Sequence, residues 1–210
     1  MDKSAELRWI FPGNLPSDIF KIFSQSSFLS HEDFREDIYL KFPASITVGV
    51  KFRESNLEIK PLIQSLGNFK ITDEVAGLIE IWEKWSCNLQ EDNFFYKAAI
   101  SEGLWIKVGK ERWIRKFINN KGITEVSGDS SSDFGCSVEI SKIKYEEKIY
   151  WSLGFETFGN FENPEMILKE ITIYFFEKIL TKVTFDLSNG EEGSFKLNYS
   201  CSYPLWLKNQ

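Results

Sequence analysis

The sequence predicts a single α+β domain over residues 1–210, in which an antiparallel β-barrel or a strongly curved sheet has helices packed on its outside. Two patterns predict this class. Short segments with alternating charged and apolar residues recur along the chain, and segments with apolar residues at helical spacing lie between them. The composition, 42% hydrophobic with 19 Phe and 7 Trp, allows a sizeable core. No repeat or linker divides the chain, so one domain is expected.

The segment Val48–Lys60 has the clearest alternation. Lys51 and Arg53 fall on one face of an extended strand, and the residues between them are apolar. After a turn at residues 54–56, Glu58 and Lys60 again share a face. Such a hairpin can have its charged face in water. Alternatively, helices cover the apolar face and the charged face lines a closed barrel.

Further strands are predicted at segments with alternating or β-prone residues. In the strand Ala5–Phe11, Glu6 and Arg8 share a face. In the strand Gly103–Phe117, Lys110 and Arg112 share a face. A segment rich in Gly, Ser and Asp, Lys121–Gly135, is predicted to be a loop. The strands are Ala5–Phe11, Arg35–Phe42, Phe94–Ala99, Gly103–Phe117, Cys136–Lys144, Lys148–Phe158, Val183–Leu187 and Gly193–Ser202.

Three helices are predicted. A short one starts at Pro16 and has apolar residues at Ile19, Phe20 and Phe23. A long one is expected over Ile71–Leu89, because Thr72 is a suitable N-cap and apolar residues follow at helical spacing. These apolar residues are Val75, Leu78, Ile79, Trp82 and Trp85. The third begins at Pro164 after the cap Asn163, runs to about Lys182, and covers the sheet with Ile167, Ile171, Tyr174, Phe175 and Leu180.

Several classes of function are disfavoured by composition. The net charge of −6 argues against a nucleic-acid partner. No apolar run reaches the ~18 residues of a membrane helix, and the first residues do not form a signal peptide. The three cysteines fit no zinc or disulfide spacing, so free thiols in the cytoplasm are expected. His31, the only histidine, disfavours a His-rich metal site or a Ser-His-Asp triad. The apolar segment Tyr203–Leu207 can pack against the barrel or form an oligomer contact.

Short motifs with charged residues recur along the predicted strands. They are Glu6-x-Arg8, Lys51-x-Arg53, Lys60, Lys110-x-Arg112, Val138-Glu139-Ile140 and Leu153-Gly154-Phe155-Glu156. With these residues, the chain resembles the CYTH superfamily, also called triphosphate tunnel metalloenzymes, over residues 5–202. The resemblance implies a closed antiparallel barrel of about eight strands whose charged lumen binds triphosphate with a divalent metal. It matches the basic half of the family's site better than the acidic half.

The resemblance also implies roles for individual residues. The cations Arg8, Lys51, Arg53, Lys60, Lys110 and Arg112 would bind phosphate. The carboxylates Glu6, Glu139 and Glu156 would hold Mg²⁺ or Mn²⁺. The family's first strand carries Glu-x-Glu-x-Lys, whereas Glu6, Arg8 and Ile10 stand here, and Phe158 takes the place of a late acid. Arg8 would repel a metal and is expected to pair with a glutamate.

The favoured hypothesis is therefore binding of an anionic, phosphate-containing small molecule in the lumen, with weak or no catalysis. A first alternative is a metal-dependent hydrolase of triphosphate or polyphosphate compounds, which would need the metal as well as the cations. A second alternative is a non-catalytic protein-interaction domain whose charged face is solvated. The sequence assigns no catalytic residue.

Overall fold

The computed structural model of the chain describes residues 2–41, 45–54, 56–89, 104–128, 134–159, 162–187 and 190–210. Within these ranges, the strands and helices build a barrel and its cover. In chain order they are β1 (Asp2–Pro12), α1 (Ser17–Phe23), β2 (Ser30–Leu40), β3 (Val48–Arg53), β4 (Asn56–Lys70), β5 (Ala76–Asn88), β6 (Trp105–Asn119), β7 (Ile123–Val126), β8 (Phe134–Tyr145), β9 (Lys148–Gly159), α3 (Pro164–Lys178), β10 (Thr184–Asp186), β11 (Glu192–Ser194), the 3₁₀ turn η1 (Leu197–Tyr199) and α4 (Tyr203–Lys208).

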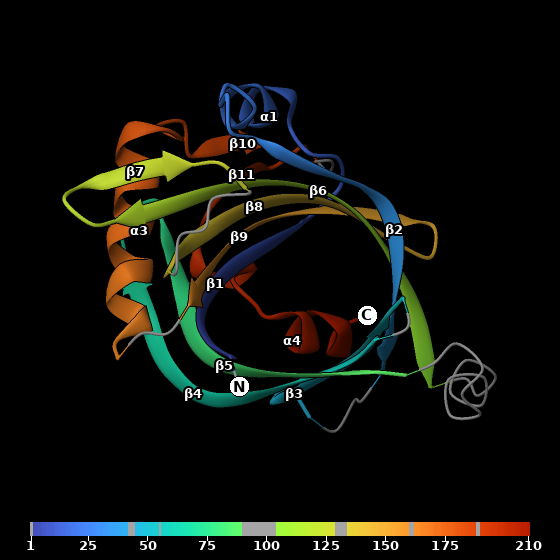
Figure 1. Cartoon of the computed structure of the whole chain (residues 1–210). Coiled ribbons are helices and arrows are strands. Elements are labelled where there is room, and N and C mark those ends of the chain that lie inside the picture. Colours follow the sequence, from blue (N-terminus) through green and yellow to red (C-terminus); the bar gives the residue numbers. More distant parts are fainter. Residues whose placement is uncertain are drawn as a thin grey trace.

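Eight strands form a closed antiparallel barrel (Figure 1). Their order is β2-β3-β4-β5-β1-β9-β8-β6, and pairing between β2 and β6 closes the ring. The short strand β7 pairs with the end of β6. This architecture confirms the predicted α+β class with an antiparallel barrel. Closure gives each of these strands a paired neighbour on both sides, although β2 and β3 pair only through Ile38–Phe52 and Tyr39–Lys51.

The barrel has its main apolar core on the outside. On β1, Leu7, Trp9 and Phe11 point outward and are almost completely buried, whereas Glu6 and Arg8 alternate with them and point inward. Helices α1 and α3 and the β10–β11 hairpin contribute residues to this outer core. The charged faces of the strands are therefore enclosed, as the second interpretation of the Val48–Lys60 hairpin predicted. Its other part, a cover of helices over the apolar face of this hairpin, is not found, because Val48, Val50, Leu57 and Ile59 are only half-buried and belong to neither described apolar cluster.

Helix α3 covers β1 and β9 from outside (Figure 1). It begins at Pro164 as predicted, but it ends at Lys178 rather than near Lys182. Its buried face includes Phe175 and Phe176, and the ring of Phe176 lies 5.8 Å from that of Trp9 in an edge-to-face arrangement. Burial of such aromatic side chains is what holds the helix on the barrel.

The prediction of a helix over Ile71–Leu89 is wrong, because Ala76–Asn88 forms the strand β5. The apolar spacing of this segment fits a helix, but its residues also alternate with period two. Ile79 and Ile81 face the outer core, whereas Trp82 and Lys84 line the lumen. Backbone pairing with β4 on one side and β1 on the other decides the conformation, since tertiary context outweighs local propensity.

Other boundaries also differ from the predictions. The predicted loop Lys121–Gly135 contains the strand β7, and β2 begins at Ser30 rather than Arg35. The predicted strand Gly193–Ser202 is reduced to β11 followed by η1, because β10 and β11 form a separate two-stranded sheet. The predicted strand Phe94–Ala99 lies outside the described residues.

The segment Tyr203–Leu207 lies within helix α4, which closes one end of the barrel interior (Figure 1). There Trp206 and Leu207 are buried in an inner apolar cluster with Ile10, Tyr39, Val108, Ile143 and Tyr145. The C-terminal segment therefore packs against the barrel, the first of its two predicted placements. Within the ranges that the structure describes, no helix is long and apolar enough to cross a membrane.

Candidate functional site

The candidate site is a cavity of about 170 Å³ inside the barrel. Its wall carries seven cationic side chains and four carboxylates, together with aromatic and small residues. The charged residues are Arg8, Lys51, Arg53, Lys60, Lys84, Lys110, Arg112, Glu6, Glu58, Glu139 and Glu156. All nine site residues expected from the sequence are among them. Their roles in ligand or metal binding stay a prediction.

Strand alternation explains why these side chains meet. Where pairing in the ring is regular, every second residue of a strand lies on its inner face, so a pair such as Lys51 and Arg53 points to the barrel axis. Gly154 on β9 makes space for one of them, because a Cβ atom at this position would lie 2.7 Å from the guanidinium carbon of Arg8. Pairing between β6 and β8 is regular through Gly109, so Lys107 lies on the opposite face from Lys110 and Arg112. Lys107 consequently points outward and contacts Glu36.

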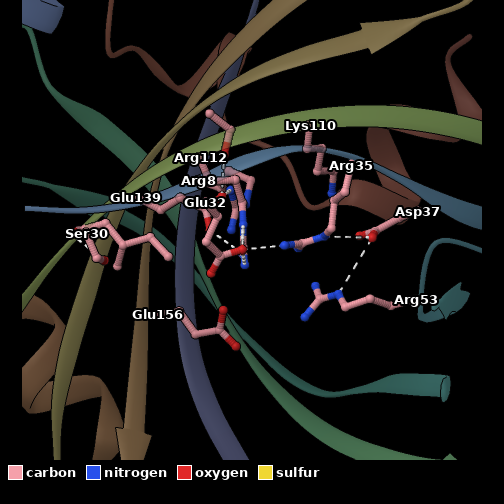
Figure 2. A network of polar contacts seen from close by, with 12 residues as sticks. Arg8, Ser30, Glu32, Arg35, Asp37, Arg53, Lys110, Arg112, Glu139 and Glu156 are labelled. Carbon is pink, nitrogen blue, oxygen red and sulfur yellow. Dashed lines mark hydrogen bonds and ion pairs between the residues drawn. The ribbon is translucent and has the colours of Figure 1, made fainter. Parts of the chain in front are cut away.

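A chain of alternating charges crosses the inner wall (Figure 2). Its members come from β3, β2, β6, β8 and β1, and comprise four arginines and three carboxylates in the order Arg53, Asp37, Arg35, Glu32, Arg112, Glu139, Arg8. Nitrogen–oxygen distances are 3.6 Å for Arg53–Asp37, 3.1 Å for Arg35–Asp37, 2.8 Å for Arg112–Glu139 and 3.2 Å for Arg8–Glu139. Both ends of this ionic chain are arginines, so it carries a surplus of positive charge.

The carboxylates of the ionic chain are held in their ionised form. Burial alone would raise the pKa of Glu139, but Arg112 and Arg8 lower it well below its usual range. Burial likewise opposes ionisation of Asp37, and Lys51, Lys110 and Arg53 together lower its pKa. Lys51 contacts Asp37 at 2.9 Å and Glu58 at 3.3 Å, which joins the hairpin β3–β4 to the ionic chain.

A second group of charges surrounds Lys60. Its ammonium contacts Glu6 and lies 2.8 Å from a carboxylate oxygen of Glu156. Glu6 is directly opposite Glu156 on β9 and directly opposite Glu80 on β5, so three glutamates stand side by side across three strands. Burial and the nearby Glu156 raise the pKa of Glu6, and burial raises the pKa of Glu80. The Lys60 ammonium lowers the pKa of Glu156, so the repulsion within this row at neutral pH falls mainly on Glu6 and Glu80.

Replacing Glu80 with glutamine is expected to increase the free energy of unfolding at pH 7 by about 0.2–1 kcal/mol, the range for a cross-strand pair. A raised pKa means that the fold disfavours the carboxylate, so wild-type stability falls as pH rises through that pKa. The amide keeps an oxygen that can accept the 3.1 Å bond from the Trp82 indole. Urea unfolding at pH 7 and at pH 4 should show the gain at pH 7 and its decline at pH 4. A loss of stability at pH 7 would contradict this view of the glutamate row.

Lys110 is the buried cation of the cavity wall that contacts no carboxylate among the described residues. Its side chain is only 4% exposed, and among the described residues no carboxylate oxygen lies within 4 Å of its ammonium. Instead, Nζ lies 2.5 Å from the Tyr39 hydroxyl and 3.4 Å from the centre of the Tyr203 ring. Burial first, and then the positive charge of Lys51, lower its pKa well below that of an ordinary lysine.

Several polar atoms near the cavity lack a hydrogen-bond partner within the described part of the chain. They are Nε of Arg53, Nη2 of Arg35 and the hydroxyls of Ser152, Ser202 and Tyr203. Tyr203, Ser202 and Arg53 line the cavity, but these particular atoms are buried, and Nε of Arg53 faces Asp37 at 3.6 Å. Unpaired buried polar atoms are costly to the fold.

The three carboxylates expected to hold a metal do not suit one. Glu6 and Glu156 share Lys60, and Glu139 lies between Arg8 and Arg112. Among the residues that the structure describes, no group of three or more His, Cys, Asp or Glu has an arrangement that could hold a metal ion. Arg8 pairs with Glu139 rather than with Glu6, which agrees with the expectation that it pairs with a glutamate. A divalent cation at this wall would face arginine and lysine side chains at short range.

Sequence reasoning missed several residues of the site. Asp37 and Tyr39 share the inward parity of β2, and this alternation was the available signal. Lys84 was hidden by the wrong helix over Ile71–Leu89. Glu32 and Arg35 both belong to the ionic chain because the β2–β6 register shifts between them. No local sequence pattern predicts this shift. No sequence signal places Tyr203 inside the barrel, since it belongs to a helix far along the chain.

Comparison with known proteins gives little further information. No protein-family model and no curated protein matches the chain. Similar solved structures include the PH1819 protein from Pyrococcus horikoshii, with 14% identity over 99% of each chain and a TM-score of 0.49. A conserved hypothetical protein from Pyrococcus furiosus has 13% identity over 84% of this chain and 90% of that chain, with a TM-score of 0.42. The PH1012 protein from P. horikoshii has 16% identity over 80% and 85%, with a TM-score of 0.40. At these TM-scores the likenesses carry no argument about function.

Proposed function

We propose that the barrel lumen binds a small phosphate-containing anion and does not need a divalent metal to do so. The observation that carries this proposal is the charge of the cavity wall, where seven cationic side chains face four carboxylates. Arginine and lysine in a largely desolvated cavity bind phosphate oxygens through charge-assisted hydrogen bonds. The guanidinium of Arg53 and the phenol of Tyr203 line the same wall.

The size of the cavity limits the ligand. Its volume of about 170 Å³ is below the roughly 300–1,000 Å³ of pockets that enclose drug-sized molecules. Helix α4 occupies one end of the lumen and contributes Tyr203 and Pro204 to the wall. A phosphate, a pyrophosphate or a small phosphorylated metabolite suits this space better than a nucleoside triphosphate. We place this binding in the cytoplasm, where the free thiols of Cys87, Cys136 and Cys201 would stay reduced.

The resemblance to the triphosphate tunnel superfamily supports the same ligand class, because that family binds phosphate groups in a charged barrel lumen. Membership in the superfamily is part of the proposal. The pairing of Glu6, Glu139 and Glu156 with cations favours binding over the metal-dependent hydrolysis of the first alternative. The second alternative assumed a solvated charged face, whereas these charged side chains line a cavity.

Titration calorimetry with pyrophosphate and tripolyphosphate tests the proposal. Binding heat is expected in a buffer that contains a chelator, and Mg²⁺ or Mn²⁺ should not be required. Phosphate release should stay well below about 1 per second, an ordinary enzyme rate. Binding that appears only with metal, or faster turnover, would favour the hydrolase. Absence of heat with both anions would overturn the proposal.

Replacing Arg53 with alanine is expected to weaken pyrophosphate binding by about 1–3 kcal/mol, the range for a hydrogen bond to a charged group. This loss corresponds to a roughly 5- to 150-fold higher Kd in the same calorimetric titration. Lys107→Ala is the matched control, since its side chain is 62% exposed on the outer face of β6. The control should leave Kd within about twofold, because exposed charges are screened by salt. Equal effects of both variants would contradict a lumenal site.

A further inference from the structure

Lys110 differs from the other buried cations of the cavity wall in the groups that its ammonium contacts. The arginines of the ionic chain, together with Lys51 and Lys60, each contact at least one carboxylate. Lys110 contacts a phenol hydroxyl and an aromatic face instead, in a position almost closed to bulk solvent. The remaining cavity lysine, Lys84, is not similarly buried. Lys110 is thus a desolvated amine that lines a ligand-sized cavity.

The groups around Lys110 act in opposite directions on its protonation. Burial, Lys51 on β3 and Arg8 on β1 disfavour the charged form, whereas Asp37 on β2, Glu139 on β8 and the ring faces of Tyr39 and Tyr203 favour it. Burial is the largest of these effects, and the pKa of Lys110 is lowered. Both carboxylates are already engaged by arginines, which weakens their effect on Lys110. The two nearest groups, Tyr39 on β2 and Tyr203 on α4, remain protonated phenols because burial raises their pKa.

A desolvated lysine beside other cations is the arrangement that makes an amine nucleophilic near neutral pH. We propose that Lys110 is a reactive amine that forms an imine with a small aldehyde or ketone bearing an acidic group. This inference deepens the proposed function, on which it rests for the negative charge of the ligand. Nothing in the binding proposal itself requires a covalent bond.

The step balances without a redox partner. The neutral amine of Lys110 attacks the carbonyl carbon, and one proton passes from the nitrogen to the carbonyl oxygen to give a carbinolamine. The hydroxyl then leaves with the remaining N–H proton as one water molecule, and the imine forms between Nζ and the former carbonyl carbon. The Tyr39 hydroxyl, 2.5 Å from Nζ, is placed to exchange a proton with the amine. The guanidiniums of Arg8, Arg53 and Arg112 line the same cavity and would hold the acidic group.

Reductive labelling of the wild-type protein tests this inference directly. Glyoxylate, a small aldehyde with a carboxylate, is incubated with the protein at pH 7 in the presence of cyanoborohydride. The reductant converts an imine into a stable carboxymethyl amine, which peptide mass spectrometry assigns to a residue. Lys107 and Lys142 are internal controls, since their side chains are 62% and 51% exposed.

Lys110 is expected to be labelled at least about tenfold faster than Lys107 and Lys142 at pH 7. An ordinary exposed lysine, with a pKa of about 10.4, is almost wholly protonated at that pH, and each unit of pKa difference changes the neutral fraction about tenfold. The preference should shrink as the pH is raised towards about 10, where exposed amines also lose their protons. Equal or slower labelling of Lys110 at pH 7 would overturn the inference.

Two further arms separate the parts of the argument. Propanal, which has no acidic group, should label Lys110 with a smaller preference, and an undiminished preference would overturn the anionic character of the ligand. Pyrophosphate binding without preferential Lys110 labelling would refute the imine and leave the proposed function standing. Preferential labelling without any pyrophosphate heat would refute the proposed phosphate binding and leave the reactive amine. The two failures are therefore distinguishable in one set of samples.

Discussion

Replacing Asp37 with asparagine is expected to lower the free energy of unfolding by about 3–5 kcal/mol, the cost of breaking a buried ion pair from one side. The Asp37 carboxylate is completely buried and contacts Lys51 at 2.9 Å, Arg35 at 3.1 Å and Arg53 at 3.6 Å. Asparagine keeps the shape but leaves these three cations without their shared counter-charge. Urea unfolding at pH 7 measures the loss.

The pH dependence of the same variant has a definite sign. Because the folded protein holds the pKa of Asp37 below its unfolded value, this carboxylate stabilises the fold above about pH 4, and the contribution is lost as pH falls through the folded pKa. The difference between wild type and variant should shrink in acid. Asp33→Asn is the matched control on β2, since the Asp33 side chain is 99% exposed, and a change within about 0.5 kcal/mol is expected. Equal losses of unfolding free energy in both variants would show that the buried ion pairs of Asp37 do not stabilise the fold.

Asp37→Asn should also strengthen anion binding. The variant removes one negative charge from behind the cavity wall, so Lys51 and Arg53 have less intramolecular compensation. Pyrophosphate should consequently raise the midpoint of thermal unfolding more in the variant than in wild type, because a ligand stabilises the state that binds it. A smaller ligand-induced shift in the variant would contradict the assignment of these cations to the ligand.

Replacing Trp206 with alanine is expected to cost about 3–5 kcal/mol of unfolding free energy, the range for a large aromatic residue in a core. Trp206 is 5% exposed and packs edge-to-face with Tyr150 at 5.1 Å and Tyr145 at 6.0 Å between ring centres. The substitution leaves a void in the inner apolar cluster that seats α4. The loss is measured by chemical unfolding.

Trp85→Ala is the appropriate comparison, because Trp85 is 51% exposed on β5. Its loss should be about 1 kcal/mol or less, as for other exposed sites. The Trp206 variant should also expose Tyr203 and Lys110, since the same helix carries Tyr203 into the cavity. If Trp206→Ala costs no more than Trp85→Ala, helix α4 does not close the barrel in solution.

The inner face of the barrel was predictable from sequence because strand alternation is local. Lys51 with Arg53, and Lys110 with Arg112, share a face whatever the rest of the chain does. Closure of the ring then turns all such faces to one axis, so residues with the same parity on different strands meet. The resemblance to the tunnel superfamily supplied the expectation of closure.

The elements that were mispredicted depend on distant partners. The residues of β5 satisfy a helical and a strand pattern equally well, and only pairing with β1 and β4 decides between them. That error removed Glu80 and Lys84 from consideration. Tyr203 lies in the lumen because α4 buries Trp206 and Leu207 at the barrel end, a contact between segments far apart in the sequence.

The position of β1 between β5 and β9 governs how the chain can fold during synthesis. Glu6 pairs with Glu80 on one side and Glu156 on the other, so its second partner leaves the ribosome on the order of ten seconds later at about 5–20 residues per second. Until then, the apolar face with Leu7, Trp9 and Phe11 lacks the cover of α3 and of the β10–β11 hairpin, because both follow β9 in the chain. Pairing of strands so far apart in sequence loses chain entropy before the new contacts can stabilise the fold. The cavity is therefore complete only after α4 has been translated, since Tyr203 and Pro204 belong to its wall.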